Sequence, residues 1–434
     1  MDKLHLGVGR QLITPPIGGQ LYGYRPDLYS ESLADDLTAT ALYFSQGDTR
    51  AVMVSATVCL IQTALCHEIR ALLAEKLSVP PENCVICATH THSGPNTGGT
   101  KGWGDLDRAY CDSIFIPRIL AAAEEAKNSA RPVTLGVGRG ESFVGVNRRV
   151  LKPDNKTGHG QDPFGVFDPR MTVLAFRDEA GAPVANLIHY GAHCTACGSN
   201  KEISRDWAGV MIDALERETG AVTAFFNGTE GDVGPRLTNG KTTGDLRYAM
   251  ELGGVAARDA VAIYRNIFAW NPIRLRVGNR QLQLPRKSRL TPDEARVEYE
   301  LYREKSHNVG LQMKDYLERV LRSYEEGYEE IAATPMEQTV IALGNVAFAS
   351  CPFELFSGVG IRVDGCFPET AVLSLSNANG NEGYFVTQDA LCRGGYEVKK
   401  FQCEHIQPYC DDADWHLMTQ TVQHVRDVLE EEAL

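Results

Sequence analysis

The sequence predicts an α/β fold built on a mixed β-sheet. Short apolar runs, typical of buried strands, recur along the 434 residues and alternate with segments of helical periodicity. One further run, residues 272–284, alternates polar and apolar side chains, as a half-exposed antiparallel strand does. Buried strands next to helices, together with an antiparallel strand, indicate a sheet of mixed direction. A chain of this length can also bury a sizeable core.

The predicted elements follow one another without an internal repeat, a low-complexity tract or an obvious linker. Buried strands are expected at residues 51–60, 84–88, 171–176, 185–189, 221–226, 340–343, 346–350 and 371–376. Helices that alternate with several of these strands are expected at residues 63–77, 207–218 and 413–432.

A long helix is predicted over residues 291–333. Thr291 is a typical N-cap, Pro292 fits the first helical turn, and Glu294 completes a capping box. Further along, apolar residues recur at helical spacing, which indicates a face that packs rather than one that functions. These residues are Met313, Leu317, Val320, Leu321 and Tyr324.

The composition argues against several classes of partner. The chain has 43 Lys and Arg against 56 Asp and Glu, a net charge of −13, and no compact basic block. Nucleic acid and anionic membrane surfaces are therefore not expected partners. No run approaches the ~20 apolar residues of a membrane-spanning helix, so no membrane insertion is expected. The sequence sets no expectation for the oligomeric state.

The cysteines and the N-terminus predict a cytoplasmic location. The twelve cysteines are scattered, several of them through predicted core strands, and do not form a short disulfide framework. The first residues contain no apolar segment of the kind found in secretory signals. Reduced thiols in the cytoplasm are therefore expected.

Two histidines follow directly after a predicted buried strand. His90 and His92 lie between the run 84–88 and a Gly-Pro turn at residues 94–95. In extended backbone, residues two apart point to the same side, so both rings can address one point. Zinc commonly binds neutral imidazole nitrogens. A lone His-x-His pattern also occurs in ordinary polar loops, so the pattern by itself leaves both interpretations open.

Other predicted strands also end in polar segments. The run at 185–189 leads into residues 190–198, and the run at 221–226 leads into residues 227–236. The runs at 346–350 and 371–376 lead into Glu354 and into residues 377–380. Loops beyond strand ends are where α/β folds usually place their sites, so these segments are expected to form one.

Taken in order, motifs along nearly the whole chain resemble those of the neutral (non-lysosomal) ceramidase family. That family consists of zinc-dependent amidases that cleave N-acylsphingosine. The matching segments are ITPPIGG (13–19), ATHTHSGP (88–95), NRR (147–149), AHCT (192–195), SRDWAG (204–209), NGTEGDVGPR (227–236), PFE (352–354) and GY (383–384), with a tyrosine at 396.

The resemblance implies a site and a reaction. It makes the ligands of one zinc ion His90, His193, Glu354 and Tyr384. It places three further side chains around the reacting carbonyl, namely His92, Arg148 and Tyr396. Zinc lowers the pKa of a bound water toward ~7, a histidine can move a proton, and Arg and Tyr can stabilise an oxyanion. The expected reaction is amide hydrolysis by a zinc-activated water.

The resemblance also implies the fold and the extent of the domain. We expect layered mixed β-sheets flanked by helices, as in the catalytic domain of neutral ceramidases. One such domain is expected to fill residues 1–434, with 291–333 as an elaboration near the site. The C-terminal immunoglobulin-like domain of ceramidases is not expected.

Several neighbouring residues keep alternative interpretations. His189 and His193 form a His-x3-His pattern, but four extended residues span roughly 13 Å, so His189 is expected to be structural. Cys194 and Cys197 are a possible redox or metal pair, although small packed thiols are the favoured interpretation. Asp206 suits an N-cap and Asp232 a loop cap, and either carboxylate could instead orient a ligand histidine.

Two departures from the family set the expected substrate. Ceramidases carry serine in the segment where this chain has Gly234, and a water nucleophile does not need that hydroxyl. An acidic cytoplasmic protein without a lipid-facing segment is expected to act on a small soluble N-acyl compound or lactam. The alternatives are ceramide itself, an ester or acetylated carbohydrate, or no turnover by a zinc-binding homologue. Arg148 and Arg149 are also candidates for binding a substrate carboxylate.

Overall fold

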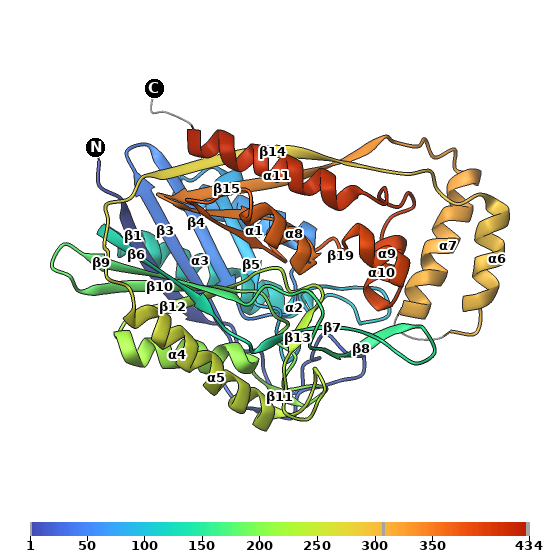
Figure 1. The fold of residues 1–434 in the computed structure, drawn as a ribbon, viewed down its shortest axis with the longest axis horizontal. Coiled ribbons are helices and arrows are strands. Elements are labelled where there is room, and N and C mark those ends of the chain that lie inside the picture. The colour runs from blue at the N-terminus through green and yellow to red at the C-terminus, as the bar shows by residue number, and fades with distance from the viewer. Residues whose placement is uncertain (1, 306–308, 431–434) are drawn as a thin grey trace.

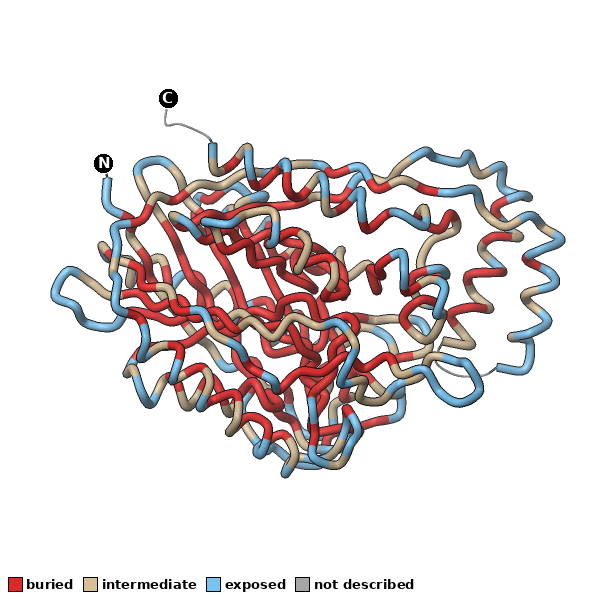
Figure 2. Tube along the Cα trace, viewed as in Figure 1, coloured by how far each residue is buried: buried red, intermediate tan, exposed pale blue. Residues whose placement is uncertain are grey.

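The computed structural model describes residues 2–305 and 309–430. These residues form four layers, in which two β-sheets pack face to face and helices cover both outer faces (Figure 1). Buried residues concentrate in the sheets, while the outer helices and the connecting loops carry the exposed ones (Figure 2). The predicted arrangement of layered mixed sheets flanked by helices is therefore confirmed.

The larger sheet has eight strands of mixed direction. Its outer pairs, β10–β12 and β4–β5, are parallel, and the pairs between them are antiparallel. Its strands, in spatial order, are β12 (Val222–Asn227), β10 (Pro183–Tyr190), β9 (Arg170–Asp178), β6 (Arg131–Glu141), β1 (His5–Leu12), β3 (Thr38–Gln46), β4 (Thr49–Ala56) and β5 (Cys84–Ala88). The run predicted to extend to residue 60 ends as a strand at Ala56.

The smaller sheet has four strands, which are β14 (Leu275–Pro285), β15 (Ala333–Leu343), β16 (Val346–Ser350) and β18 (Ala371–Leu375). β14 is antiparallel to β15 and only partly buried, as its polar–apolar alternation predicts. Alternate residues of each strand form the core between the sheets. In β3, for example, Leu42 and Phe44 face that core, whereas Ala41 and Tyr43 face the helices.

Six helices cover the sheets. On the larger sheet, α1 (Thr63–Leu77) and α3 (Ile116–Asn128) pack over one half, and α4 (Asp206–Thr219) and α5 (Leu246–Arg265) over the other. On the smaller sheet lie α8 (Ser357–Asp364) and α11 (Ala413–Glu430). Gly220, in the left-handed conformation that a C-cap favours, ends α4. The three short predicted helices are thus present, although residues 431–432 lie outside the described part.

The long helix predicted over residues 291–333 is wrong, because two helices occupy this segment. They are α6 (Pro292–Tyr302), which begins with the predicted capping box, and α7 (Val309–Glu325). Residues 306–308 lie outside the described part, and Ala333 already belongs to β15. A single helix of that length would run for about 65 Å with little to pack against. Two shorter helices bury their apolar faces against each other instead.

The smaller elements gather near the ends of the strands. Two pairs of short strands are β2 (Ser32–Leu33) with β11 (Glu202–Ile203) and β17 (Glu354–Leu355) with β19 (Tyr384–Phe385). A three-stranded sheet consists of β13 (Val233–Pro235), β7 (Gly145–Leu151) and β8 (Thr157–Asp162). The short helical elements are α2 (Arg108–Tyr110), α9 (Gln388–Arg393), α10 (Tyr396–Cys403), the 3-10 turn at Pro81–Asn83 and the π-helical turn at Cys111–Phe115. In the described residues, no helix combines the length and the apolarity that crossing a membrane requires.

A buried histidine links the stability of this fold to pH. His424 of α11 is 2% exposed, and its Nδ1 lies 3.1 Å from Oε1 of Gln338. Burial and the nearby Arg280 lower its pKa to about 4. As the pH falls below ~6.5, the unfolded chain therefore binds a proton at His424 before the folded protein does. The free energy of unfolding consequently falls between pH 6.5 and 4.

We expect His424→Gln to weaken this pH dependence. Because glutamine does not titrate, the free energy of unfolding of the wild type should fall by about 2 kcal/mol more than that of the variant between pH 7 and pH 5. Urea unfolding at the two pH values measures the difference. Parallel pH profiles for the two proteins would contradict the assignment of this proton to His424.

Candidate metal centre and active site

His90 and His92 lie just beyond the carboxyl end of β5. His90 has a φ of 70°, a left-handed conformation that is uncommon outside glycine. Its Nδ1 lies 2.7 Å from the backbone oxygen of Cys59, which fixes the ring. Nε2 of His92 lies 3.3 Å from Nε2 of His90. The predicted pair therefore shares one point in space.

His193 follows β10, which lies near the other end of the strand order from β5, and it reaches the same point because β12 packs against β5. Because β10 and β12 are parallel, the loops after both strands leave the sheet at one edge. Nδ1 of His193 donates to the backbone oxygens of Glu230 at 2.9 Å and Val233 at 3.1 Å, both in the loop after β12. The ring is thus held with its Nε2 directed away from this loop.

The second half of the chain supplies a carboxylate and a phenol. The short strands β17 and β19 are parallel, and their register pairs Glu354 with Tyr384. Oε2 of Glu354 lies 3.4 Å from Nε2 of His90 and 3.2 Å from Nε2 of His193. The hydroxyl of Tyr384 lies 3.5 Å from the same His193 nitrogen. The structure therefore brings all four residues of the predicted ligand set together.

The chemistry of these donors fits a metal ion. Both histidines are placed to donate from Nδ1 to backbone carbonyls, which leaves a lone pair on each Nε2. Oε2 of Glu354 accepts no hydrogen bond from any described residue and faces the two lone pairs. Three buried lone pairs that converge in this way repel one another unless a cation lies between them. Two imidazoles with a carboxylate are a common zinc donor set.

The protonation states of two of the three donors agree with this interpretation. Burial, Arg148 and His90 lower the pKa of His193 to about 3, so the ring is neutral at pH 7. Burial alone would raise the pKa of Glu354, but His90 and His193 hold it well below its usual value. Metal ligands must be deprotonated, and both groups are so at neutral pH. The third donor differs: although burial lowers the pKa of His90, Cys59 and Glu354 raise it well above its usual value, so a bound metal ion would have to replace a proton on this ring.

A second group with metal-binding potential shares His90. Ligand atoms of Cys59, His90 and His92 lie within 4.8 Å of one another, as do those of His90, His193 and Glu354. Burial raises the pKa of the Cys59 thiol, which keeps its proton and weakens it as a ligand. Sγ of Cys59 also lies on the Nδ1 side of His90, at 3.9 Å, where the ring donates to a carbonyl. The group that contains Glu354 is therefore the better metal site.

Arg148 joins the site through Tyr384. Its Nη2 donates to the Tyr384 hydroxyl at 2.9 Å, and its Nε donates to Oε1 of Glu397 at 3.0 Å. Glu397 also pairs with Arg149 and with Nε2 of His159. Glu397 thus orients the guanidinium beside the donor cluster, a role that no local sequence pattern indicated. Both arginines pair with Glu397, and their further role in binding a substrate carboxylate stays a prediction.

Tyr396 and His92 complete the predicted set. The ring of Tyr396 packs 5.7 Å from that of Tyr384, and burial raises the pKa of its hydroxyl, which keeps its proton. Burial and the neighbouring His90 and His193 lower the pKa of His92 well below its usual value. Around the four candidate ligands, the structure therefore gathers a neutral imidazole, a guanidinium and a protonated phenol.

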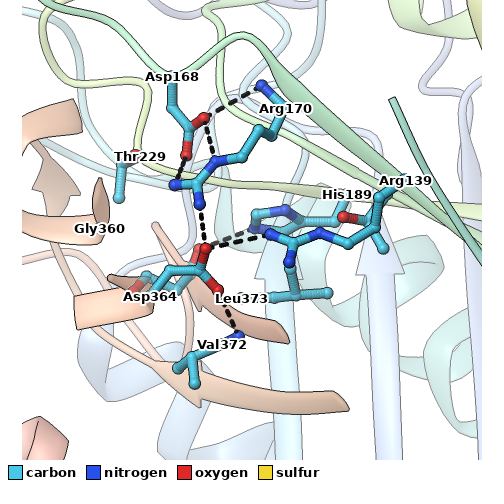
Figure 3. Close-up of a pocket in the computed structure, with 11 residues that line it drawn as sticks. Arg139, Asp168, Arg170, His189, Thr229, Gly360, Asp364, Val372 and Leu373 are labelled. Atoms are coloured by element: carbon cyan, nitrogen blue, oxygen red, sulfur yellow. Dashed lines mark hydrogen bonds and ion pairs between the residues drawn. The ribbon is translucent and has the colours of Figure 1, made fainter. Parts of the chain in front are cut away.

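His189 does not belong to this cluster. Its Nε2 lies 3.0 Å from the backbone oxygen of Ser374, and the ring lines a separate cavity of about 20 Å³. Figure 3 shows this cavity, where Asp364 pairs with Arg139 and Arg170. Such a volume holds about one water molecule, and the charged side chains around it form ion pairs with one another. His189 therefore has the structural role expected of it.

The other uncertain residues are structural as well. Cys194 and Cys197 are free, and burial raises the pKa of both thiols. Asp206 is the first residue of α4 rather than its N-cap, and its carboxylate accepts from the backbone N–H groups of Ala196, Cys197 and Trp207. Asp232 accepts from the backbone and side chain of Ser357, which is the role of a loop cap. Neither carboxylate bonds to a ligand histidine in the described residues.

Glu230 is a buried residue of the site to which the sequence assigned no role. It is fully buried, and its Oε1 accepts a 2.6 Å hydrogen bond from Nδ2 of Asn377. Burial, partly offset by His90, raises the pKa of this carboxyl to about 8. Its backbone oxygen also orients His193. The only signal for it was its place in the NGTEGDVGPR segment after a strand.

Crowding explains why residue 234 is glycine here. Gly234 pairs with Val146 in the β13–β7 ladder. A Cβ at this position would lie 2.7 Å and 2.8 Å from side-chain carbons of Thr242 and 3.4 Å from Cβ of Arg148. A serine would therefore need Thr242 to move. Glycine at position 234, where the family pattern has serine, therefore avoids a close contact with Thr242 beside Arg148.

Gly231 lets the loop after β12 dock against the strand that carries Glu354. Its N–H donates to the backbone oxygen of Leu355 at 2.7 Å, and a Cβ would lie 2.4 Å from the backbone oxygen of Glu354. We expect Gly231→Ala to lower the free energy of unfolding by about 1–3 kcal/mol and to weaken zinc binding, because the backbone of Glu354 must shift.

Urea unfolding and zinc titration measure the two effects of Gly231→Ala. Gly254→Ala is the matched control, since a Cβ there meets open space in α5 and should stabilise that helix. Equal stability and equal zinc affinity in Gly231→Ala and the wild type would contradict the close approach.

The fold and the site together define a layered α/β protein with a buried histidine–carboxylate cluster that could hold a metal ion. The sequence pattern described as "Neutral/alkaline non-lysosomal ceramidase, N-terminal" matches residues 4–248, more than half of the chain. The chain therefore belongs to the neutral/alkaline non-lysosomal ceramidase family, as its motifs predicted. The matched region contains His90, His92, Arg148 and His193, whereas Glu354 and both tyrosines lie beyond it.

Individual relatives give the extent of the similarity. Neutral ceramidase A of Dictyostelium discoideum is 27% identical over 227 residues, which cover 46% of this chain and 31% of that protein. Neutral ceramidase of Pseudomonas aeruginosa is 28% identical over 168 residues, which cover 36% of this chain and 24% of that protein. The matches thus span about a third or less of these curated relatives.

A solved structure shows that the fold is shared along the whole chain. The crystal structure of neutral ceramidase from Pseudomonas aeruginosa superposes with a TM-score of 0.75 and 20% identity, covering all of this chain and 76% of that one. A ceramidase structure titled as complexed with C2 superposes with a TM-score of 0.73 and 18% identity. At these identities the similarity concerns the fold.

Proposed function

We propose that this protein is a zinc-dependent amidohydrolase that cleaves an N-acyl or lactam bond in a small soluble compound. The observation that carries the proposal is the convergence of Nε2 of His90, Nε2 of His193 and Oε2 of Glu354 on one buried point. Membership of a family whose curated relatives are named neutral ceramidases supports amide hydrolysis. A cytoplasmic location, as the sequence predicts, is part of the proposal.

The metal would be held by His90, His193 and Glu354, with Tyr384 as a fourth ligand, at one zinc ion per chain. A bound zinc ion supplies Lewis-acid activation of water and of a carbonyl oxygen. Tyr384 would bind through its phenol oxygen, which already receives a hydrogen bond from Arg148.

The other residues would act on the reacting amide. His92 is neutral, so it can take a proton from the attacking water and deliver it to the leaving nitrogen. Arg148 is fixed by Glu397 and can donate to the oxyanion that develops on the carbonyl oxygen. Tyr396 keeps its proton and would donate to the same oxygen. Water is consumed, and the products are a carboxylate and an amine.

Ceramide hydrolysis is the second candidate, because the curated relatives are named neutral ceramidases. The cavity that contains Glu354 favours the smaller substrate, since charged side chains line much of it. Two long hydrocarbon chains would find little apolar surface there.

A substrate panel on zinc-reconstituted protein tests the proposal. We expect N-acyl amino acids or lactams to be hydrolysed more efficiently than short-chain ceramide in detergent micelles, and chelation to abolish the activity. Faster turnover of ceramide would replace the proposal with the second candidate. Turnover of matched esters but not of amides would indicate an esterase or deacetylase. Zinc binding without any turnover would indicate a silent homologue.

A further inference from the structure

The cavity beside Glu354 is large enough for a substrate and carries several charges. Its volume is about 340 Å³, and α7 and α10 form much of its wall. Its charged lining residues are Lys101, Asp315, Arg319, Glu354, Lys400 and Glu404. The side of α7 that faces the cavity thus differs from its apolar packing side.

Most of these charges have partners within the protein. Asp315 pairs with Lys101 at 3.4 Å and with Arg319 at 3.0 Å. Arg319 also donates to the backbone oxygens of Cys403 and Glu404. These side chains therefore hold α7 against α10, and they leave little binding capacity for a ligand.

Lys400 differs from them because its ammonium group lies beside two aromatic rings and has the carboxylates of Glu404 and Glu354 only at longer range. Its Nζ lies 5.5 Å from the ring centroid of Trp103 and 5.8 Å from that of Tyr396. Within residues 2–305 and 309–430, Lys400 forms no ion pair and no hydrogen bond through Nζ. The rings leave the donors of the ammonium group available, and the cavity lies beside them.

A second lining residue also has an unused polar atom. Gln312 of α7 is 8% exposed, and its Nε2 donates to the backbone oxygen of Lys101 at 3.1 Å. Its Oε1 is buried and accepts no hydrogen bond from the described residues. A buried polar atom without a partner costs free energy, so a donor group that reached this acceptor from the cavity would recover part of that cost.

We propose that Lys400 binds a carboxylate of the substrate, and that the substrates are small amides with such a group remote from the scissile bond. This inference rests on the proposed function, because it concerns the same cavity. Lys400 lies one helical turn after Tyr396, so an amide whose carbonyl reaches Tyr396 extends past Trp103 toward the ammonium. Glu404, one turn further on, lines the same cavity and would repel a second anionic group.

Matched substrates test the inference directly. We would compare N-acyl amino acids with their carboxamide analogues on zinc-loaded wild type, Lys400→Met and Lys287→Met. We expect kcat/KM for the carboxylate substrate to fall about 10- to 100-fold in Lys400→Met, mainly through KM, while the carboxamide is unaffected. Lys287 is exposed, pairs with Asp411 and does not line the cavity, so Lys287→Met should behave as the wild type. Glu404→Gln should lower KM for the carboxylate substrate.

A binding measurement keeps the inference testable if no amide is turned over. Glutarate and butyrate would be titrated into zinc-loaded protein with calorimetric detection, because only the dicarboxylate can reach the metal and Lys400 together. We expect glutarate to bind about 10-fold more tightly than butyrate in the wild type and equally in Lys400→Met.

The outcomes separate the two proposals. Failure of the wild type to hydrolyse either member of the substrate pair counts against the proposed function, and the glutarate titration then decides the role of Lys400. Equal hydrolysis of both members, or a carboxylate preference that survives Lys400→Met, would overturn the inference. A fall in kcat for both members in Lys400→Met would overturn it too, since Lys400 would then act on Tyr396 rather than on the substrate.

Discussion

His193→Ala and Glu354→Ala should each remove bound zinc and abolish hydrolysis. His193 offers a neutral Nε2 and Glu354 an ionised Oε2 that lies 3.2 Å from it. Loss of either side chain leaves the metal site with one ligand fewer. Losing an outer hydrogen-bond partner typically costs 10- to 100-fold in metal affinity, so the loss of a ligand should exceed about 100-fold.

Elemental analysis of the purified proteins measures this effect, with about one zinc per chain expected in the wild type. His189→Ala is the matched control, because it removes a half-buried imidazole four residues earlier that bonds to the backbone of Ser374. It should keep its zinc, and thermal melts report whether each variant folds. Full zinc content in His193→Ala, or a wild type that binds no metal after reconstitution, would refute the ligand assignment.

Arg148→Lys should retain zinc but lose most of its catalytic rate. A lysine keeps the positive charge, but it cannot donate to Glu397 and to the Tyr384 hydroxyl in the geometry of the guanidinium. Loss of one oxyanion donor typically lowers kcat by about 10²- to 10³-fold. We therefore expect a fall of that size in kcat with KM little changed, measured on the best amide of the substrate panel.

Zinc content and a second arginine serve as controls for Arg148→Lys. Arg265→Lys alters an exposed pair with Glu218 and should leave kcat unchanged. If Arg148→Lys loses its zinc together with its activity, Arg148 supports Tyr384 as a ligand rather than the reacting oxygen. If kcat is unaffected, the guanidinium has no part in the reaction.

Local patterns in the sequence were sufficient to predict a mixed α/β fold and to locate several of its strands. Apolar runs such as residues 84–88 and 346–350 coincide with β5 and β16, because a strand buried on both faces needs uninterrupted apolar residues. Strands β1, β3, β6 and β7 were missed, and in β1 and β7 polar or charged residues interrupt the apolar runs. The prediction of one long helix was wrong because of tertiary packing: α6 and α7 bury their apolar faces against each other.

The candidate site could be predicted only where a motif marks it. His90 and His193 follow strands directly, and the family pattern supplied Glu354, Tyr384 and Tyr396. Glu397 could not be found in this way, because its partner Arg148 lies 249 residues away and no periodicity links them. Lys400 carries no signal at all in the sequence. Its position between Trp103 and Tyr396 exists only after the chain has folded.

The pairing of β17 with β19 has a consequence for how the centre is assembled. It brings Glu354 and Tyr384 to histidines that lie more than 150 residues earlier, across the contact between the two sheets. Neither sheet alone carries a complete set of donors. A metal ion bound by these residues would therefore stabilise the docked arrangement of the sheets, and we expect it to bind only to the correctly assembled chain.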